Sequence, residues 1–109
     1  MKIITLHNRI DPGELREHIK KHLNKMFREQ RKVELDFIVS GVGNIIDILE
    51  SELYKSILFH IDVRGSELYI TRSEHYVDDV NSLTVESILN ELFNDVAGKF
   101  GTDLLREGW

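Results

Sequence analysis

The stretch DPGELREHIKKHLNKMFREQ, residues 11–30, decides the fold because it joins a helix start signal to one continuous apolar stripe. Asp11 can accept hydrogen bonds from the free amide groups of a first turn, Pro12 suits that turn, and Glu14 completes a capping-box pattern. The apolar residues then recur at spacings of three and four: Leu15, Ile19, Leu23, Met26 and Phe27. This pattern predicts an amphipathic helix that runs to about Gln30 and packs on a core.

A second amphipathic helix is predicted over Val85–Phe100. Its start is expected to be capped by Ser82 or Thr84, and Gly101 is expected to end it. Its apolar stripe consists of Val85, Ile88, Leu89, Leu92, Phe93 and Val96. Two helices with one apolar stripe each need a common partner layer to bury those stripes.

Four segments are rich in β-branched residues or alternate apolar with polar residues, as strands do. They are Lys2–Leu6, Val33–Val39, Ser56–Val63 and Glu67–Thr71. A further segment, Ile45–Leu53, fits two patterns. Its aliphatic spacing favours a helix capped by Asn44, whereas its first residues, Ile-Ile-Asp-Ile, also suit a strand. We expect a helix there, with a strand as the alternative.

A hairpin is predicted between the last two strand segments, with Arg64-Gly65 as its turn. The apolar faces then match, because Ile61 stands opposite Leu68. On the other face, Asp62 stands opposite Glu67. The residues expected to point inward from the first of these strands are Ile57, Phe59, Ile61 and Val63.

These elements follow the order β-α-β-(α or β)-β-β-α, which predicts an α+β fold. We expect a small two-layer sandwich, with a mixed or antiparallel sheet of about four strands and two main helices. The 109 residues suit one domain over residues 1–101 and a C-terminal tail over residues 102–109. Three large apolar side chains of the tail are expected to dock on the domain, on a second copy in a homodimer, or on a partner: Leu104, Leu105 and Trp109.

The composition limits the classes of function. The chain has no cysteine, which removes disulfides, thiolate nucleophiles and cysteine-bound zinc. No apolar run approaches the roughly 18 residues of a membrane span, and the short N-terminal apolar stretch does not make a signal peptide. We therefore expect a cytoplasmic protein with no membrane association and no cofactor. Because no nucleophile-and-base pattern is evident, we do not expect an enzyme.

The charge of the chain is divided between two regions. Residues 1–32 hold nine Lys/Arg against four Asp/Glu, a net charge of +5, whereas residues 33–109 hold five against fifteen, a net charge of −10. Such a small, polarised domain is typical of proteins that contact another macromolecule. Because the total is −5, we expect nucleic acid to be contacted only through the basic first helix, if at all.

An acidic surface is the candidate site for a protein partner. The segment Glu74–Asp79 carries a tyrosine among carboxylates, and the second helix adds further acids. A tyrosine can anchor an interface while carboxylates steer a basic partner. The residues expected to bind the partner are Glu74, Tyr76, Asp78, Asp79, Glu86, Glu91 and Asp95.

Three motifs are weaker candidates for chemistry. Asp36, Asp62 and Glu67 can share the solvent face of the sheet, where carboxylates are able to hold Mg²⁺. His18 and His22 lie four residues apart on one helix face, but the zinc-protease glutamate is missing between them. The Gly-rich segment 41–44 lacks the spacing of phosphate-binding loops and is interpreted as a turn.

The leading hypothesis is a small acidic cytosolic protein-binding module that docks on a basic, nucleic-acid-binding partner. It would act as an inhibitor, or as an antitoxin or anti-defence protein, by occupying the place of the phosphates. The second hypothesis is a self-associating structural or assembly protein. The third is a metal-dependent enzyme that uses the carboxylates of the sheet. The identity of the partner is not encoded in any motif of the sequence.

Overall fold

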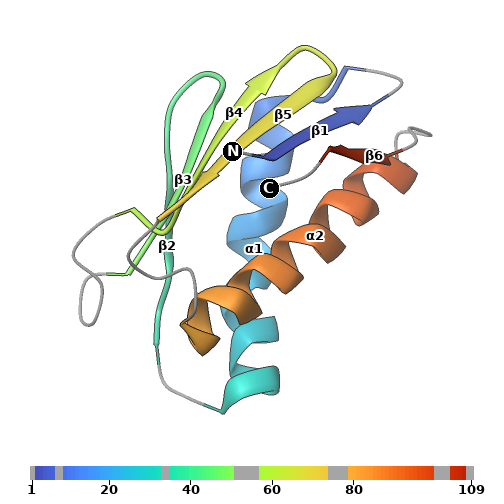
Figure 1. Cartoon of the computed structure of the whole chain (residues 1–109). Coiled ribbons are helices and arrows are strands. Elements are labelled where there is room, and N and C mark those ends of the chain that lie inside the picture. Colours follow the sequence, from blue (N-terminus) through green and yellow to red (C-terminus); the bar gives the residue numbers. More distant parts are fainter. Residues whose placement is uncertain are drawn as a thin grey trace.

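The protein folds into one antiparallel sheet with two helices packed on it. The computed structural model describes residues 2–6, 9–32, 35–50, 57–73, 79–99 and 104–107. The elements, in chain order, are β1 (Lys2–Leu6), α1 (Pro12–Arg31), β2 (Ile38–Ser40), β3 (Ile45–Leu49), β4 (Phe59–Arg64), β5 (Glu67–Arg72), α2 (Val80–Lys99) and β6 (Leu104–Glu107). The six described strands have the spatial order β2-β3-β4-β5-β1-β6 (Figure 1). The predicted α+β class is confirmed, with two more strands than expected.

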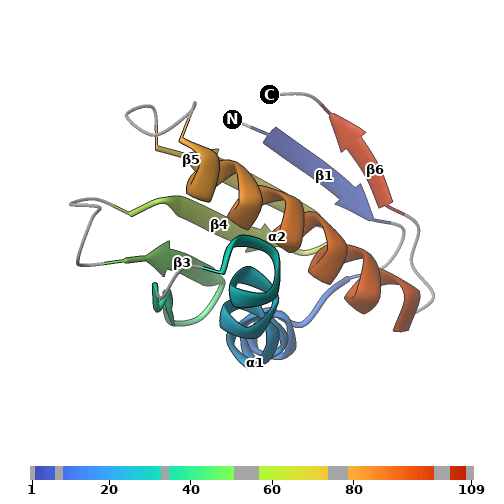
Figure 2. The ribbon, with the colours of Figure 1, turned by 90° about the horizontal axis from the view of Figure 1, so that it is seen from below.

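Both helices lie on the same face of the sheet. Figure 2 shows the strands as one curved layer, with α1 and α2 side by side beneath it. The two predicted apolar stripes are buried between the helices and the sheet, except that Met26 is only partly buried. Neither described helix has the length and the apolar character that a membrane crossing requires. The opposite face of the sheet is not covered by any described helix.

The start of α1 follows from its sequence. Asp11 is the N-cap residue, and its Oδ2 accepts a hydrogen bond from the backbone N–H of Glu14 at 3.2 Å. Pro12 occupies the first turn, where its missing N–H costs no hydrogen bond. The helix ends at Lys32, which adopts a left-handed conformation and donates its backbone N–H to the Arg28 carbonyl. The predicted capping signal and the predicted extent are both confirmed.

Replacing Asp11 by alanine is expected to lower the free energy of unfolding by about 1 kcal/mol, because the amide of Glu14 loses its acceptor. Urea titration followed by circular dichroism measures this loss. Asp11→Asn is the matched control, since asparagine keeps a side-chain oxygen at the cap and should retain most of the stability. Equal unfolding midpoints for Asp11→Ala and the wild type would contradict the capping role.

The segment Ile45–Leu49 is a strand, so the expectation of a helix there is wrong and the alternative is right. Strand β3 pairs with β2 on one side and with β4 on the other. Ile46 and Ile48 are fully buried, whereas the alternate residues Ile45, Asp47 and Leu49 are only partly buried and face away from the core. Pairing on both sides satisfies the backbone groups of β3, and no local spacing of aliphatic residues reveals that benefit.

The hairpin between β4 and β5 turns one residue later than predicted. Arg64 pairs with Glu67, so the turn residues are Gly65 and Ser66, and Gly65 has φ +62°. The register therefore changes by two residues, so Ile61 pairs with Ile70 and not with Leu68 as expected, and the apolar faces still match. The neighbour of Asp62 is therefore Tyr69, and the expected apposition of Asp62 to Glu67 is wrong. The correct turn places glycine where the backbone adopts positive φ.

Strand β4 is also shorter than predicted at its start. Ile57 is 40% exposed, whereas its neighbour Leu58 is fully buried, so the expected inward position of Ile57 is wrong. The alternation of burial begins only at Phe59, where pairing with β3 and β5 begins. Residues 57 and 58 precede the paired positions, so their burial does not follow the alternation of the strand.

Helix α2 begins five residues before the predicted start. Asp79 caps it: its Oδ2 accepts from the backbone N–H of Ser82 at 2.9 Å. Ser82 is buried, and the Thr84 hydroxyl donates to the Val80 carbonyl within the helix. The expectation that Ser82 or Thr84 is the cap is therefore wrong. Asparagine and aspartate at residues 79–81 obscured the start, because such residues are equally common in loops.

The predicted strand Val33–Val39 is wrong over residues 35–37, which belong to no described strand, because β2 begins only at Ile38. Residues 35–37 lie next to β2, and Asn24 of α1 holds them: its side chain accepts from the Phe37 N–H at 2.7 Å and donates to the Phe37 carbonyl at 3.1 Å. At the other edge, β6 from the expected tail pairs antiparallel with β1. The predicted strand residues Val33 and Glu34 lie outside the described part of the chain.

Candidate functional site

The uncovered face of the sheet is the most extended surface that the described strands build. Because side chains alternate along a strand, the residues between the core positions all emerge on this side. The register places them in rows that cross the sheet. The rows, from one end to the other, are Ile38 and Leu49; Ser40, Asp47, His60 and Thr71; Ile45, Asp62, Tyr69 and Ile3; and Arg64, Glu67 and Thr5. We call these residues the open face.

A carboxylate–imidazole pair lies near the middle of the open face. His60 Nδ1 is 2.5 Å from Asp47 Oδ1, across the β3–β4 pairing. The Asp47 side chain is only 19% exposed, whereas that of His60 is 44% exposed. The carboxylate therefore orients an imidazole whose ring remains accessible from the solvent side. The pocket between the two helices, described below, does not include this pair among its lining residues.

A second polar network occupies the end of the face next to the β4–β5 turn. Arg64 Nε donates to Asp62 Oδ2 at 2.8 Å, and the Arg64 guanidinium lies 4.4 Å from the centre of the Tyr69 ring. The Tyr69 hydroxyl donates to Glu67 Oε1 at 3.1 Å. The hydrogen bond to Asp62 and its charge raise the pKa of Arg64, and the hydrogen bond to Glu67 raises the pKa of Tyr69. Arg64 and Tyr69 therefore both stay protonated throughout the neutral range.

Apolar side chains lie directly beside these charges. Ile45 is the cross-strand neighbour of Asp62 on one side, and Tyr69 is its neighbour on the other. Ile38, at the β2 edge, is 50% exposed and stands opposite Leu49. The open face thus mixes aliphatic and aromatic surface with fixed ion pairs.

The acidic surface predicted from the sequence is only partly described. Glu74, Tyr76 and Asp78 lie outside the described residues. Of the remaining four, Asp79 caps α2, Glu86 Oε2 lies 3.5 Å from an Arg72 nitrogen, Asp95 pairs with His18, and Glu91 is exposed. Three of these carboxylates therefore make hydrogen bonds or ion pairs within the protein itself. Within the described part of α2, Glu91 is the one whose carboxylate has no such contact.

The expected docking tail contributes an edge strand. Leu104 and Leu105 belong to β6, where they are in register with Leu6 and Thr5 of β1. Trp109 lies outside the described residues. In the described sheet β6 is an outer strand, so its free backbone edge is where a further strand could pair.

The three carboxylates of the metal hypothesis are not brought together. Asp36 pairs with Arg28 of α1, beside the β2 edge. Asp62 is occupied by Arg64, and Glu67 accepts from Tyr69. Across the described ranges, no group of three His, Asp or Glu side chains has the geometry to hold a metal ion.

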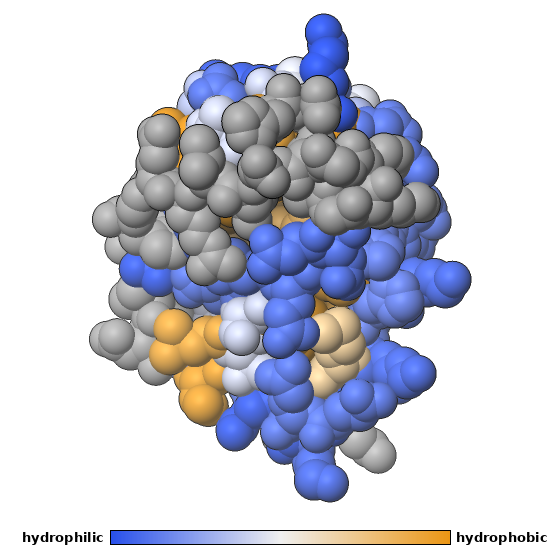
Figure 3. All heavy atoms as spheres, turned by 90° about the vertical axis from the view of Figure 1, so that its right-hand side faces the viewer, coloured by the Kyte–Doolittle hydropathy of each residue, from blue (hydrophilic) through white to orange (hydrophobic). Residues whose placement is uncertain are grey.

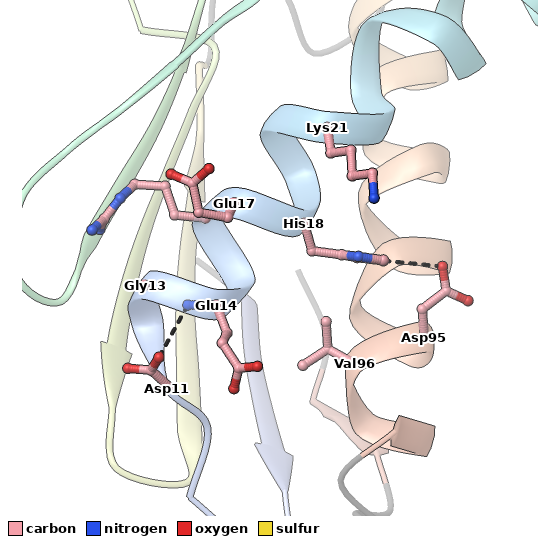
Figure 4. Close-up of a pocket in the computed structure, with 9 residues that line it drawn as sticks. Asp11, Gly13, Glu14, Glu17, His18, Lys21, Asp95 and Val96 are labelled. Atoms are coloured by element: carbon pink, nitrogen blue, oxygen red, sulfur yellow. Dashed lines mark hydrogen bonds and ion pairs between the residues drawn. The ribbon is translucent and has the colours of Figure 1, made fainter.

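A pocket of about 540 Å³ lies between α1 and α2 (Figure 4). His18 points across it from α1, with Nε2 3.3 Å from Asp95 Oδ2 of α2. The rings of His18 and His22 lie edge to face, 4.6 Å apart. Burial, followed by the charges of His18 and Lys21, lowers the pKa of His22. The two histidines therefore belong to the contact between the helices, and the spacing that suggested a metal pair has this structural explanation.

Other polar residues of the pocket also have structural partners. Asp11 caps α1, and Arg16 donates to the carbonyls of Gly43 and Ile45, both at 3.3 Å. The remaining lining combines carboxylates with Lys21, so charges of both signs face the space. No nucleophile with an adjacent base is among the lining residues. We therefore place the candidate site on the open face rather than in this pocket.

Sequence reasoning missed the pairing of Asp47 with His60. Asp47 lies in the segment expected to be a helix, so no cross-strand partner was sought for it. The strand alternative for Ile45–Leu49 is the signal that would have revealed the pair.

Comparisons with protein-family models, with curated proteins and with solved structures found no match to this chain.

Proposed function

We propose that this protein is a binding module that docks on a basic protein partner through the open face. The observation that carries this proposal is the mixture on that face of apolar side chains and carboxylates, uncovered by any described helix. The leading hypothesis from the sequence placed the interface on the acidic loop and α2. We place it on the sheet instead because aliphatic and aromatic side chains stand there in register with the carboxylates, as Ile45 and Tyr69 do on either side of Asp62.

The size of the molecule suits a protein interface. A stable interface takes about 800 Å² from each partner. The two longest dimensions of the molecule are 36 Å and 25 Å, so one face can supply such an area. A small metabolite would instead need a concave site, which the open face does not offer.

The charges of the open face favour a basic partner. Asp47, Asp62 and Glu67 supply three carboxylates, against the single guanidinium of Arg64 and the imidazole of His60. The whole chain also carries a net charge of −5, which attracts a cationic partner over a longer range. Apolar contacts would supply most of the affinity, with Tyr69 as an aromatic anchor, while the carboxylates steer the approach.

The test measures how strongly the wild-type protein and variants of its open face capture protein partners from a lysate of the native host. In one variant Leu49→Thr and Asp47→Asn are combined, since threonine has the β-branched shape that strands favour and asparagine keeps the size of aspartate. The control is Glu91→Gln, which removes an exposed carboxylate from the helix side. We expect the captured partner to be basic, and the open-face variant to weaken its binding about tenfold or more, while the control binds normally.

Three outcomes would contradict this proposal. The first is an acidic partner, and the second is a basic partner that the open-face variant still binds fully while Glu91→Gln does not, which would return the interface to α2. The third is a stable dimer of the free protein whose mass by light scattering falls when residues 102–109 are removed. That result would favour self-association through the β6 edge.

A further inference from the structure

A row of basic side chains follows the solvent side of α1. The buried residues Leu15, Ile19, Leu23 and Phe27 define the side of the helix that faces the sheet. On the opposite side, Lys21, Lys25, Arg28 and Lys32 recur at spacings of four, three and four, so they stand one above another, and all four are exposed. We call these four residues the basic stripe.

The positive charge of the basic stripe is largely uncompensated. Arg28 pairs with Asp36, but Lys21, Lys25 and Lys32 make no ion pair with any described residue. Asp95, which lines the pocket together with Lys21, pairs with His18, while Glu17 and Glu29 of α1 itself lie within one turn of members of the stripe. Between residues 20 and 32 there are six Lys/Arg and one acid, Glu29. The chain is acidic overall, yet this strip of its surface is cationic.

The spacing of the cations fits a polymer of regularly repeated negative charges. At 1.5 Å per residue, successive members of the stripe are about 4.5–6 Å apart along the axis, and the stripe is about 17 Å long. A nucleic-acid strand carries one phosphate per roughly 3.4 Å of duplex axis, so the stripe spans several phosphates. Lysine binds phosphate as a point charge, without a need for a particular base sequence.

Two other anionic partners fit less well. A helix that lies on a lipid surface needs an apolar face directed at the membrane, but the apolar face of α1 is buried in the core. Val80 and Leu83, in the first turn of α2, are exposed. On the face that Figure 3 presents, apolar side chains form small separate areas among mostly hydrophilic ones. An acidic protein would in turn need an aromatic or aliphatic anchor beside the lysines, and α1 exposes none.

We propose that the basic stripe binds the phosphodiester backbone of nucleic acid, independently of base sequence. Helix α1 and the open face lie on opposite sides of the sheet (Figure 2). Nucleic acid on the stripe therefore leaves the open face accessible. This inference does not rest on the proposed docking function, because it uses none of the residues of the open face.

The experiment measures fluorescence anisotropy of labelled duplex DNA and of labelled single-stranded RNA, each of arbitrary sequence, over a series of salt concentrations. The test variant carries Lys21→Gln, Lys25→Gln and Lys32→Gln. The control carries arginine at the same three positions and so keeps the charge. We expect the glutamine variant to bind about tenfold or more weakly at low salt, and its slope of log K against log salt to fall by about 2–3.

A second control raises the charge of the same surface. Glu29→Gln removes the one acid of this part of α1 and is expected to tighten binding, while circular dichroism confirms that every variant is folded. The proposal is overturned if the wild-type protein binds neither nucleic acid at low salt, or if the glutamine variant binds as the wild type does. Tighter binding to vesicles of anionic lipid than to either nucleic acid would also overturn it, in favour of a lipid surface.

Discussion

Replacing Gly41 by alanine should cause one of the largest losses of stability available from a single methyl group in this protein. Gly41 lies between β2 and β3 with φ +127°, a conformation that side chains rarely adopt. A Cβ at this position would lie 2.0 Å from the Ile45 carbonyl oxygen, which belongs to the backbone and cannot rotate away. We expect the free energy of unfolding to fall by roughly 3 kcal/mol or more, from strain and clash together.

The consequence should extend beyond the turn. Arg16 of α1 donates to the Gly43 and Ile45 carbonyls, so displacement of this turn also disturbs the contact between α1 and the sheet. Thermal unfolding followed by circular dichroism measures the effect. Gly43→Ala is the matched control: Gly43 has φ +60°, but a Cβ there meets no atom within 4 Å, so only the conformational cost of about 1–2 kcal/mol applies. Equal losses in the two variants would show that the close approach at Gly41 does not constrain the fold.

The second large effect is expected at Phe27. Its side chain is fully buried, and its ring packs edge to face against Phe37, with the ring centres 4.7 Å apart. Phe27→Ala should lower the free energy of unfolding by about 3–5 kcal/mol, because it removes both apolar burial and the aromatic contact and leaves a cavity. Urea titration followed by circular dichroism measures this loss.

Two controls separate packing from helix propensity. Phe27→Leu keeps most of the apolar volume and should lose less than half as much stability as the alanine variant. Lys25→Ala, on the exposed side of α1, should be close to neutral, since alanine is the better helix former. If Phe27→Ala costs less than about 1 kcal/mol, the end of α1 does not pack on residues 35–37 in the way the structure indicates.

The helices were the part of the fold that the sequence predicted best. In α1, the cap at Asp11 and the apolar repeat are local signals, and local signals are sufficient when an element's own hydrogen bonds close within it. For α2 the same repeat identified the buried residues, from Val85 to Val96. Its first residues were missed because Asp79 and Asn81 resemble a loop until the capping hydrogen bond is seen.

The candidate site was predicted less well, because its members meet only across strands. Asp47 and His60 are 13 residues apart, and a one-residue shift in the β4–β5 turn is enough to replace Glu67 by Tyr69 as the neighbour of Asp62. Which residues stand opposite one another depends on the register of each strand pair, and that register is set by the turn geometry and by burial of the apolar face. For the acidic residues of α2, the ion pairs of Asp95 and Glu86 depend on α1 and β5, which no spacing within α2 reports.

The sequence by itself determined the α+β class, the two amphipathic helices, the start of α1 and the division of charge between a basic helix and an acidic remainder. These properties depend on composition, on periodicity and on hydrogen bonds between residues close in the chain. Only the tertiary structure decided that Ile45–Leu49 is a strand, that residues 104–107 extend the sheet, and which side chains share its open face. The physical reason is that a strand finds its hydrogen-bond partners, and therefore its faces and neighbours, in distant segments of the chain.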